Sequence, residues 1–236
     1  MLTLYYARPS LYSRPVWLAL LEKKLSFELI PLKLDGDQLT SKFRSLNPFG
    51  RIPVLVDNNF RIFESSAILD YLEVKYPMPA LLPTKAEILT KVRMVQMIAT
   101  NELLPAVAGL LIHDQNPPEL EYARQRAINV LAFFEQILEN HPYFGGEQLT
   151  LAEIVSGTII PDLPKLGIPL INYPKLDNWA KRLLLRESWQ QIQLSSEELN
   201  NFKRSMRLLP KIWQKRRRQR MNALAKPHST SSSVAN

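Results

Sequence analysis

Three prolines fall within the nine residues at 76–84, YPMPALLPT, and the pattern of apolar residues differs on the two sides of this run. Before it, short stretches of β-type composition alternate with helical ones. After it, apolar residues recur at helical spacing and β-propensity is weak. Because clustered prolines are typical of linkers, the sequence predicts an α/β domain at 1–77, a linker at 78–84 and an all-α domain at 85–212.

The α/β part divides into elements in the order βαβ-α-ββα. Strands are expected at 2–7, 26–34, 52–57 and 60–63, and helices near 13–24, 36–46 and from 64 onward. Pro31 indicates an edge position or a bulge for the second strand, and Asn58 and Asn59 predict a hairpin turn. Later helical patterns lie at about 85–113, 119–140, 150–160, 175–186 and 195–208.

The net charge of +8 is concentrated at the C-terminal end. Residues 215–236 carry six basic residues and no acid, which leaves +2 for residues 1–214. This composition is typical of a disordered extension, so we expect a basic tail at 213–236 and not a basic folded surface. Nucleic-acid binding is therefore not expected, except through that tail.

The composition also excludes several classes of site. The chain has no Cys, so disulfides, thiolate metal ligands and a cysteine nucleophile are excluded. Three widely separated histidines, and no glycine-rich phosphate loop, predict neither a metal site nor a nucleotide site. The N-terminal segment lacks the apolar core of a signal peptide, and the longest apolar run, at 103–112, is too short to span a membrane. A cytoplasmic protein is expected.

The stretch ESSAILDYL, residues 64–72, begins a helix with an acid and two hydroxyls. Ser is among the commonest helix caps, so capping alone explains these residues. A helix N-terminus also has free N–H groups and a partial positive charge, which suit a bound carboxylate. The residues by themselves leave both interpretations open.

Three segments resemble motifs of the glutathione transferases, in the same order along the chain. Residues 46–72 resemble the family's glutathione-site signature, LNPFGRIPVLVDNNFRIFESSAILDYL. Residues 5–23 resemble the first strand and helix of theta-like and phi-like bacterial members, YYARPSLYSRPVWLALLEK. Residues 145–154, GGEQLTLAEI, resemble the start of the core helix of the second domain, where Thr150 and Glu153 form a capping-box pattern. The resemblance implies a thioredoxin-like N-terminal domain followed by an all-α domain.

The resemblance also implies how glutathione would bind. A cis peptide bond between Ile52 and Pro53 would expose the Ile52 backbone to the cysteinyl part, whereas without the resemblance Pro53 reads as a proline that opens a strand. Glu64 would pair with the γ-glutamyl ammonium and Ser65 would bind its carboxylate. The remaining contacts are expected from Gln38 and Arg51.

Catalysis in this family requires glutathione as the thiolate. A thiol with a pKa near 8.5 is about 3% ionised at pH 7, and lowering that pKa by about two units needs roughly 2.7 kcal/mol. Ser10 falls where theta-like and phi-like members carry a catalytic serine, so we expect its hydroxyl to stabilise the thiolate. Tyr6, Ser13 and Arg14 are the alternatives.

The family implies a cytosolic homodimer that transfers glutathione to hydrophobic electrophiles or reduces peroxides, as in detoxification. The electrophile pocket is expected to include Leu11, Tyr12, Met97, Asn101 and Leu104. Glutathione-dependent thiol reductases usually carry Cys at the position of Ser10, which argues against that activity. The alternative function is a non-catalytic transferase-like module for protein or RNA assembly, with the basic tail as an arm.

Overall fold

Four strands form one mixed sheet in the order β2-β1-β3-β4. They are β1 (Leu2–Tyr6), β2 (Phe27–Pro31), β3 (Val54–Asp57) and β4 (Phe60–Phe63). β1 pairs parallel with β2 and antiparallel with β3, and β3 pairs antiparallel with β4 through the expected hairpin. The edge position expected for the strand that contains Pro31 is confirmed. The computed structural model describes residues 1–33, 36–113, 116–208 and 214.

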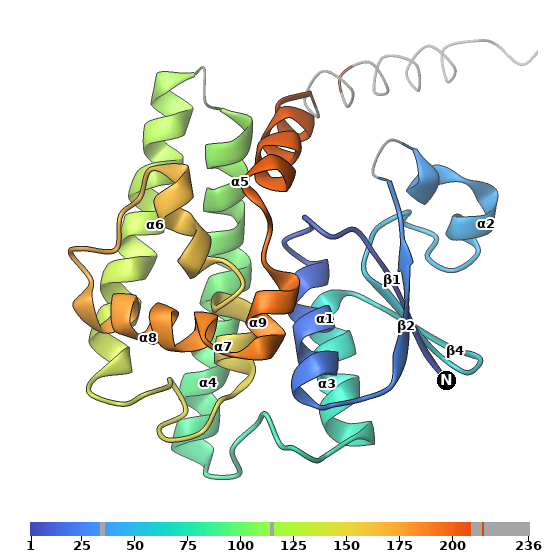
Figure 1. Cartoon of the computed structure of the whole chain (residues 1–236), viewed down its shortest axis with the longest axis horizontal. Helices are drawn as coiled ribbons and strands as arrows, with labels where there is room; N and C mark the ends of the chain where they lie inside the picture. Colours follow the sequence, from blue (N-terminus) through green and yellow to red (C-terminus); the bar gives the residue numbers. More distant parts are fainter. Residues whose placement is uncertain (34–35, 114–115, 209–213, 215–236) are drawn as a thin grey trace, which may run out of the picture.

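Helices complete the N-terminal part in the expected order. They are α1 (Ser13–Glu22), the 3₁₀ turn η1 (Asp37–Leu39), α2 (Ser41–Arg44) and α3 (Ser65–Lys75). α1 and α3 pack on each other between the sheet and the helical part, while α2 lies away from the helical part (Figure 1). Alternating burial along β1 turns Leu2, Leu4 and Tyr6 into the core.

In the second part, the described regular elements are all helices, apart from an isolated bridge between Tyr143 and Gly146. It contains α4 (Ala86–Ile98), the π-helical turn η2 (Ala99–Leu103), α5 (Leu104–Ile112), α6 (Pro117–Leu138), α7 (Leu151–Ser156), the 3₁₀ segment η3 (Ile160–Leu166), α8 (Pro174–Leu184), α9 (Glu187–Ile192) and a helix at 196–208. The expected thioredoxin-like plus all-α fold is confirmed. The sequence did not predict α9 as a separate helix, because its two buried residues, Trp189 and Ile192, are too few to show a period. The tail expected at 213–236 lies outside the described residues, apart from residue 214.

The helix that runs over α4, η2 and α5, residues 86–112, is long and apolar enough to cross a membrane by length and composition alone. Half of its most apolar stretch is buried inside the protein. α4 packs on α7 and α5 packs on α6, so this helix forms the centre of the helical part. Its burial accounts for its apolar composition.

The expected capping box begins α7. The Oγ1 atom of Thr150 accepts a hydrogen bond from the Ala152 N–H, and Glu153 accepts hydrogen bonds from both the N–H and the hydroxyl of Thr150. The other carboxylate oxygen of Glu153 accepts from the Phe144 N–H at 2.7 Å and from the Trp179 indole at 3.4 Å. Burial raises the pKa of Glu153, and these four donors stabilise its charged form.

A buried lysine holds the segment that leads from the sheet to the helical part. Lys23 follows α1, and its Nζ atom donates to the carbonyl oxygens of Tyr76 and Pro79 at 2.8 and 2.9 Å. The same atom pairs with Glu73 at 2.6 Å, and Glu73 also accepts the Leu81 N–H. Both ends of this connection are thereby fixed against α1 and α3.

A buried carboxylate joins the sheet to α3. Asp57, at the end of β3, accepts hydrogen bonds from the hydroxyls of Tyr71 and Tyr76, each at 2.8 Å. Burial would raise the pKa of Asp57, but these two donors hold it below its usual value. Burial, together with the bond to Asp57, raises the pKa of Tyr71 to about 12.

We predict that Tyr71→Phe lowers the free energy of unfolding by about 1.5 kcal/mol at pH 7, the contribution of a hydrogen bond to a charged group. Because the folded pKa of Tyr71 lies above its ordinary value of 10.0, this contribution is fully present below pH 10 and is lost as the pH rises through 12. Urea denaturation of both proteins between pH 7 and 11 measures the difference. A gap that widened above pH 10 would contradict the assignment, and Tyr5→Phe is the control.

Candidate active site

The register of the sheet brings separate segments to one end. Tyr5 of β1 lies opposite Val54 of β3, and Val54 lies opposite Phe63 of β4. β2 runs parallel to β1, with Pro31 beside Tyr6. The chain therefore leaves β1, β2 and β4, and enters β3, at the same end of the sheet.

Four segments that contain expected site residues meet at this end. They are the loop at 7–12, the 3₁₀ turn η1, the residues just before β3 and the N-terminus of α3. These segments are far apart in sequence, and the strand pairing brings their ends to the same end of the sheet. Ser10, Gln38, Ile52 and Ser65 each belong to a different one of them.

Ser10 lies between β1 and α1, with 8% of its surface exposed. Its Oγ atom accepts the Ser13 N–H at 3.2 Å, and its carbonyl oxygen accepts the Arg14 N–H at 3.1 Å. No described residue accepts its hydroxyl proton. A group hydrogen-bonded by this proton would also face the positive end of α1. The site can therefore stabilise an anion such as a thiolate.

The three alternatives to Ser10 have different surroundings. The ring of Tyr6 packs edge-on against Trp17 in the core, with their centroids 5.3 Å apart. Ser13 is fully buried, and its hydroxyl has no partner among the described residues. Arg14 is buried in the first turn of α1 and pairs with Asp162 of η3 at 2.9 Å. Arg14 thus already has a counter-ion.

The segment before β3 is held by an asparagine that the sequence reasoning missed. Asn47 is buried, donates to the Arg51 carbonyl at 2.8 Å and accepts the Phe49 N–H at 3.0 Å. The peptide bond between Ile52 and Pro53 is cis. The only sequence signal for Asn47 was its place at the start of the NPFG motif.

A close backbone contact sets Gln38 beside this segment. Gly50 has φ of +62°, and a Cβ atom there would lie 2.8 Å from the Gln38 carbonyl oxygen, so only glycine fits. The side-chain Oε1 atom of Gln38 is buried without a hydrogen-bond partner in the described chain. A buried acceptor without a partner is costly unless a ligand supplies a donor. Arg51, the residue after Gly50, is exposed.

The N-terminus of α3 has no side-chain cap among the described residues. This observation argues against the interpretation of ESSAILDYL as capping alone. Glu64 occupies the cap position with φ of 70° and ψ of 115°, a backbone conformation that is rare for a residue with a side chain. Strain of this kind gathers at functional sites. Ser65 begins the helix and is partly exposed, so the first N–H groups of α3 can bind an anion.

A cavity of about 20 Å³ lies between the two parts of the chain, next to the Ser10 loop. Its lining comes from the loop, α1, α5, residues 158–159, η3, residue 194 and the C-terminal helix, and includes Pro9, Leu11, Arg14, Val107, Asp162 and Phe202. Of the residues expected at the electrophile pocket, Leu11 lines this cavity. Leu104 is buried in the core, and Tyr12, Met97 and Asn101 are exposed outside the cavity.

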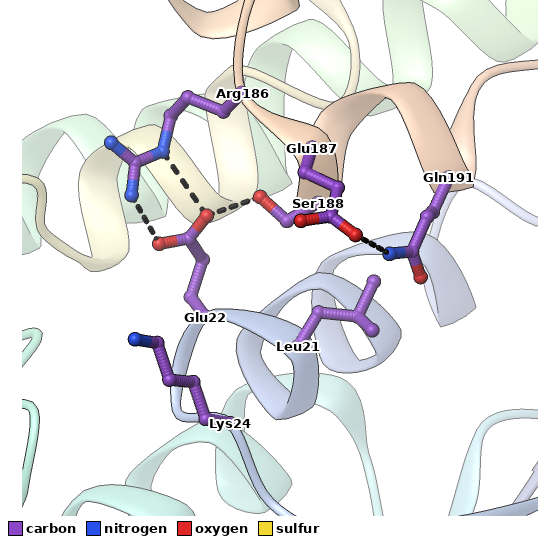
Figure 2. A pocket seen from close by; sticks show the side chains of 7 residues that line it. All are labelled: Leu21, Glu22, Lys24, Arg186, Glu187, Ser188 and Gln191. Carbon is purple, nitrogen blue, oxygen red and sulfur yellow. Dashed lines mark hydrogen bonds and ion pairs between the residues drawn. The ribbon is translucent and has the colours of Figure 1, made fainter.

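A larger open groove, about 490 Å³, lies elsewhere along the junction, where α1 ends and α9 begins. Figure 2 shows its polar side chains bonded to one another: Arg186 pairs with both oxygens of Glu22, Ser188 donates to Glu22, and Gln191 donates to Glu187. The bond to Glu22 raises the pKa of Arg186. These polar groups hydrogen-bond to one another and so connect the two parts of the chain. None of the four site segments lines the groove.

Within the described ranges, no group of three or more His, Asp or Glu side chains could hold a metal ion.

Comparison with known proteins places both parts in one family. Residues 9–75 match the model for "Glutathione S-transferase, N-terminal domain", and residues 86–187 match the model for "Glutathione S-transferase, C-terminal domain". The chain is similar to a maleylacetoacetate isomerase of Rattus norvegicus, with 28% identity over 184 residues that cover 74% of this chain and 84% of that protein. It is also similar to a stringent starvation protein A homolog of Coxiella burnetii, with 25% identity over 198 residues, covering 83% and 93%.

Among solved structures, a theta class glutathione S-transferase of Xanthomonas axonopodis pv. citri, which has glutathione bound, superposes with a TM-score of 0.74. The identity is 23%, and the match covers 83% of this chain and 98% of that one. At this identity the likeness supports the fold.

We predict that Asp162→Asn lowers the free energy of unfolding by about 3 kcal/mol, because it leaves the buried Arg14 guanidinium without a counter-ion. Asp177→Asn is the matched control, since it breaks an exposed pair with Lys181 and should cost less than about 1 kcal/mol. Urea denaturation of the two variants measures both losses. Equal losses of unfolding free energy in the two variants would contradict the prediction that the buried pair is costlier to break than the exposed one.

Proposed function

The chain belongs to the glutathione S-transferase family, and from that premise we propose that it binds glutathione and transfers its thiolate to hydrophobic electrophiles. The observation that carries the proposal is the place of Ser10, whose hydroxyl proton is available at the N-terminus of α1. The proposal includes the division of the chain into domains at 1–77 and 85–212, joined by a linker at 78–84.

In the proposed reaction, the thiol of bound glutathione loses its proton to water. The Ser10 hydroxyl donates a hydrogen bond to the resulting thiolate, and the helix N-terminus adds a favourable field. A sulfur lone pair then forms a bond to the electrophilic carbon, and the leaving group departs with its bonding electrons. Attack of the same thiolate on a peroxide oxygen, which would yield an alcohol and need a second glutathione, is the variant reaction.

Glutathione would lie across the four site segments at the end of the sheet. Ile52 would pair with its cysteinyl backbone, as an added strand pairs with a sheet edge. Ser65 and the uncapped N–H groups of α3 would bind the γ-glutamyl carboxylate, and Glu64 would pair with the ammonium. Gln38 and Arg51 would contact the rest of the tripeptide, which would supply the missing donor for Gln38.

We include a homodimer and a cytoplasmic location in the proposal. Large apolar side chains are exposed on the turn before β3, on β4, on α3 and on α4, namely Phe49, Phe60, Val74, Met94 and Met97. Exposed apolar surface of this kind is typical of an interface, and a second copy of the chain is its proposed partner.

A non-catalytic role in assembly is the second candidate. The observation that favours it is the similarity, over 83% of this chain, to a stringent starvation protein A homolog, whose name does not describe a transferase. Retention on immobilised glutathione together with turnover of an electrophile supports the transferase. Salt-sensitive RNA binding without turnover supports the assembly module.

We predict that Ser10→Ala raises the pKa of bound glutathione toward its solution value and lowers turnover at least about tenfold, since the lost hydrogen bond is worth about 1.4 kcal/mol. Thiolate absorbance of the binary complex, followed against pH, measures that pKa. Tyr6→Phe is the control, because its ring still packs on Trp17 and the pKa should stay unchanged. A raised pKa in Tyr6→Phe with an unchanged pKa in Ser10→Ala would make Tyr6 the activator. An unchanged pKa in both variants would leave Ser13 or Arg14 as the activator.

We also predict that Ser65→Ala and Glu64→Ala each weaken glutathione binding by about tenfold or more, because a hydrogen bond to a charged group is worth about 1.5–3 kcal/mol. Neither residue is buried in the core, so thermal stability should change little. Calorimetric titration with glutathione measures the affinity. Unchanged binding in both variants would remove α3 from the site.

A further inference from the structure

The loop at 7–12, which contains Ser10, includes a tight turn. The Ser10 N–H donates to the Ala7 carbonyl oxygen at 2.9 Å, with Arg8 and Pro9 between them. Because the ring of Pro9 fixes its φ angle, the turn has little freedom, and the position of Arg8 limits the position of Ser10. Within the described residues, Arg8 is the loop side chain that hydrogen-bonds to the helical part.

The guanidinium of Arg8 contacts two carbonyl oxygens, a carboxylate and an aromatic ring. Its Nη2 atom donates to the carbonyl oxygens of Gln191 and Gln193, at 3.2 and 2.9 Å, where α9 ends. The last carbonyls of a helix lack partners within it, and a basic side chain is a favourable donor to them. The Nε atom pairs with Glu198 at 2.8 Å, and the guanidinium lies 5.2 Å from the centre of the Trp17 ring of α1. Arg8 thereby fixes the loop between α1 and the end of α9.

The charge of Arg8 is balanced by Glu198. The pKa of the Glu198 carboxyl lies below its usual value, because the Ser195 N–H donates to it and Arg8 lies beside it, so Glu198 is ionised at neutral pH. The two side chains of the pair are 36% and 39% exposed, and solvent screens them further. Arg8 therefore adds little net field at Ser10, and its contacts act on Ser10 mainly through the position of the turn.

We propose that Arg8 is a positioning residue for thiolate formation: it holds the turn so that the Ser10 hydroxyl faces the sulfur of bound glutathione at the N-terminus of α1. This role rests on the proposed function and adds to it a residue that does not touch glutathione. A hydrogen bond weakens steeply when its donor points away from the acceptor. Release of the turn therefore raises the pKa of the bound thiol.

Arg8→Lys separates position from charge. Lys keeps the positive charge but lacks the planar fork with which Arg8 binds two carbonyls and stacks on a ring. Arg182→Lys is the matched control, because Arg182 also donates to a carbonyl, that of Pro142 at 2.9 Å, and lies 6.0 Å from the centre of the Tyr143 ring. Arg182 belongs to α8, outside the four site segments.

The pKa of glutathione bound to the full chain, followed by thiolate absorbance against pH, tests this role. In Arg8→Lys that pKa should lie about half a unit or more above the value in the parent, which makes the thiolate fraction at low pH about threefold smaller. Arg182→Lys should give the pKa of the parent. An unchanged pKa in Arg8→Lys overturns the role.

Glu198→Gln distinguishes positioning from a direct effect of the Arg8 charge. Glu198 accepts the Ser195 N–H at 2.8 Å and donates its own N–H to the Ser195 hydroxyl at 3.1 Å, and Gln serves equally in such a capping box. The variant leaves Arg8 without its counter-ion. If Arg8 acted through its field, the pKa of bound glutathione would fall below that of the parent, and such a fall overturns positioning. An equal or higher pKa supports it.

Hydrogen exchange tests the hold of Arg8 on the turn without glutathione. The Ser10 N–H donates to the Ala7 carbonyl, and the Ser13 N–H donates to the Ser10 hydroxyl oxygen. Both amides should exchange about two- to fivefold faster in Arg8→Lys than in the parent, because contacts that oppose opening of the turn are lost. Equal exchange in Arg8→Lys and the parent overturns the hold on the turn.

Failure of the proposed function has a separate outcome: the parent binds no glutathione in a calorimetric titration. Amide exchange alone then decides whether Arg8 holds the turn. Faster exchange at Ser10 and Ser13 in Arg8→Lys, with parental exchange in Arg182→Lys, supports that hold. The same exchange in both variants overturns it.

Discussion

The register of the sheet is the constraint on which the candidate site depends. Tyr5, Val54 and Phe63 lie in one row across β1, β3 and β4. A slip of one residue between β1 and β3 would turn the core face of a strand to solvent, so burial of Leu4 and Leu55 fixes the row. The hydrophobic pattern of the strands thereby positions the Ser10 loop, Ile52 and the start of α3, none of which bonds to another directly in the described hydrogen bonds.

The junction between the two parts is held by charge pairs of unequal burial. Arg14–Asp162 is buried beside the cavity, while Arg186–Glu22 and Arg8–Glu198 are more exposed. Buried pairs are costly to break and exposed ones are not, so Arg14–Asp162 contributes most among these three pairs to fixing the position of α1 against η3.

The sequence predicted features that depend on local chemistry. The succession of strands and helices along the N-terminal part, the hairpin at Asn58 and the capping box at Thr150 follow from spacing and residue type within a few positions, and the structure contains all of them. The contact of Gly50 with Gln38 and the bond of Arg8 to Gln193 were not predicted. Such contacts join residues far apart in the chain, and no local pattern encodes them.

The electrostatics of the Ser10 loop bear on the proposal that a hydroxyl stabilises the thiolate there. Asp162 already neutralises Arg14, so that guanidinium offers a thiolate little net charge. The roughly 2.7 kcal/mol needed to lower a thiol pKa by two units must then come from other groups. A hydrogen bond to a charged group supplies about 1.5–3 kcal/mol, and a helix N-terminus adds about 0.3–1 kcal/mol. Ser10 meets both conditions, because the Oγ atom that would donate to the thiolate accepts an N–H group of the first turn of α1.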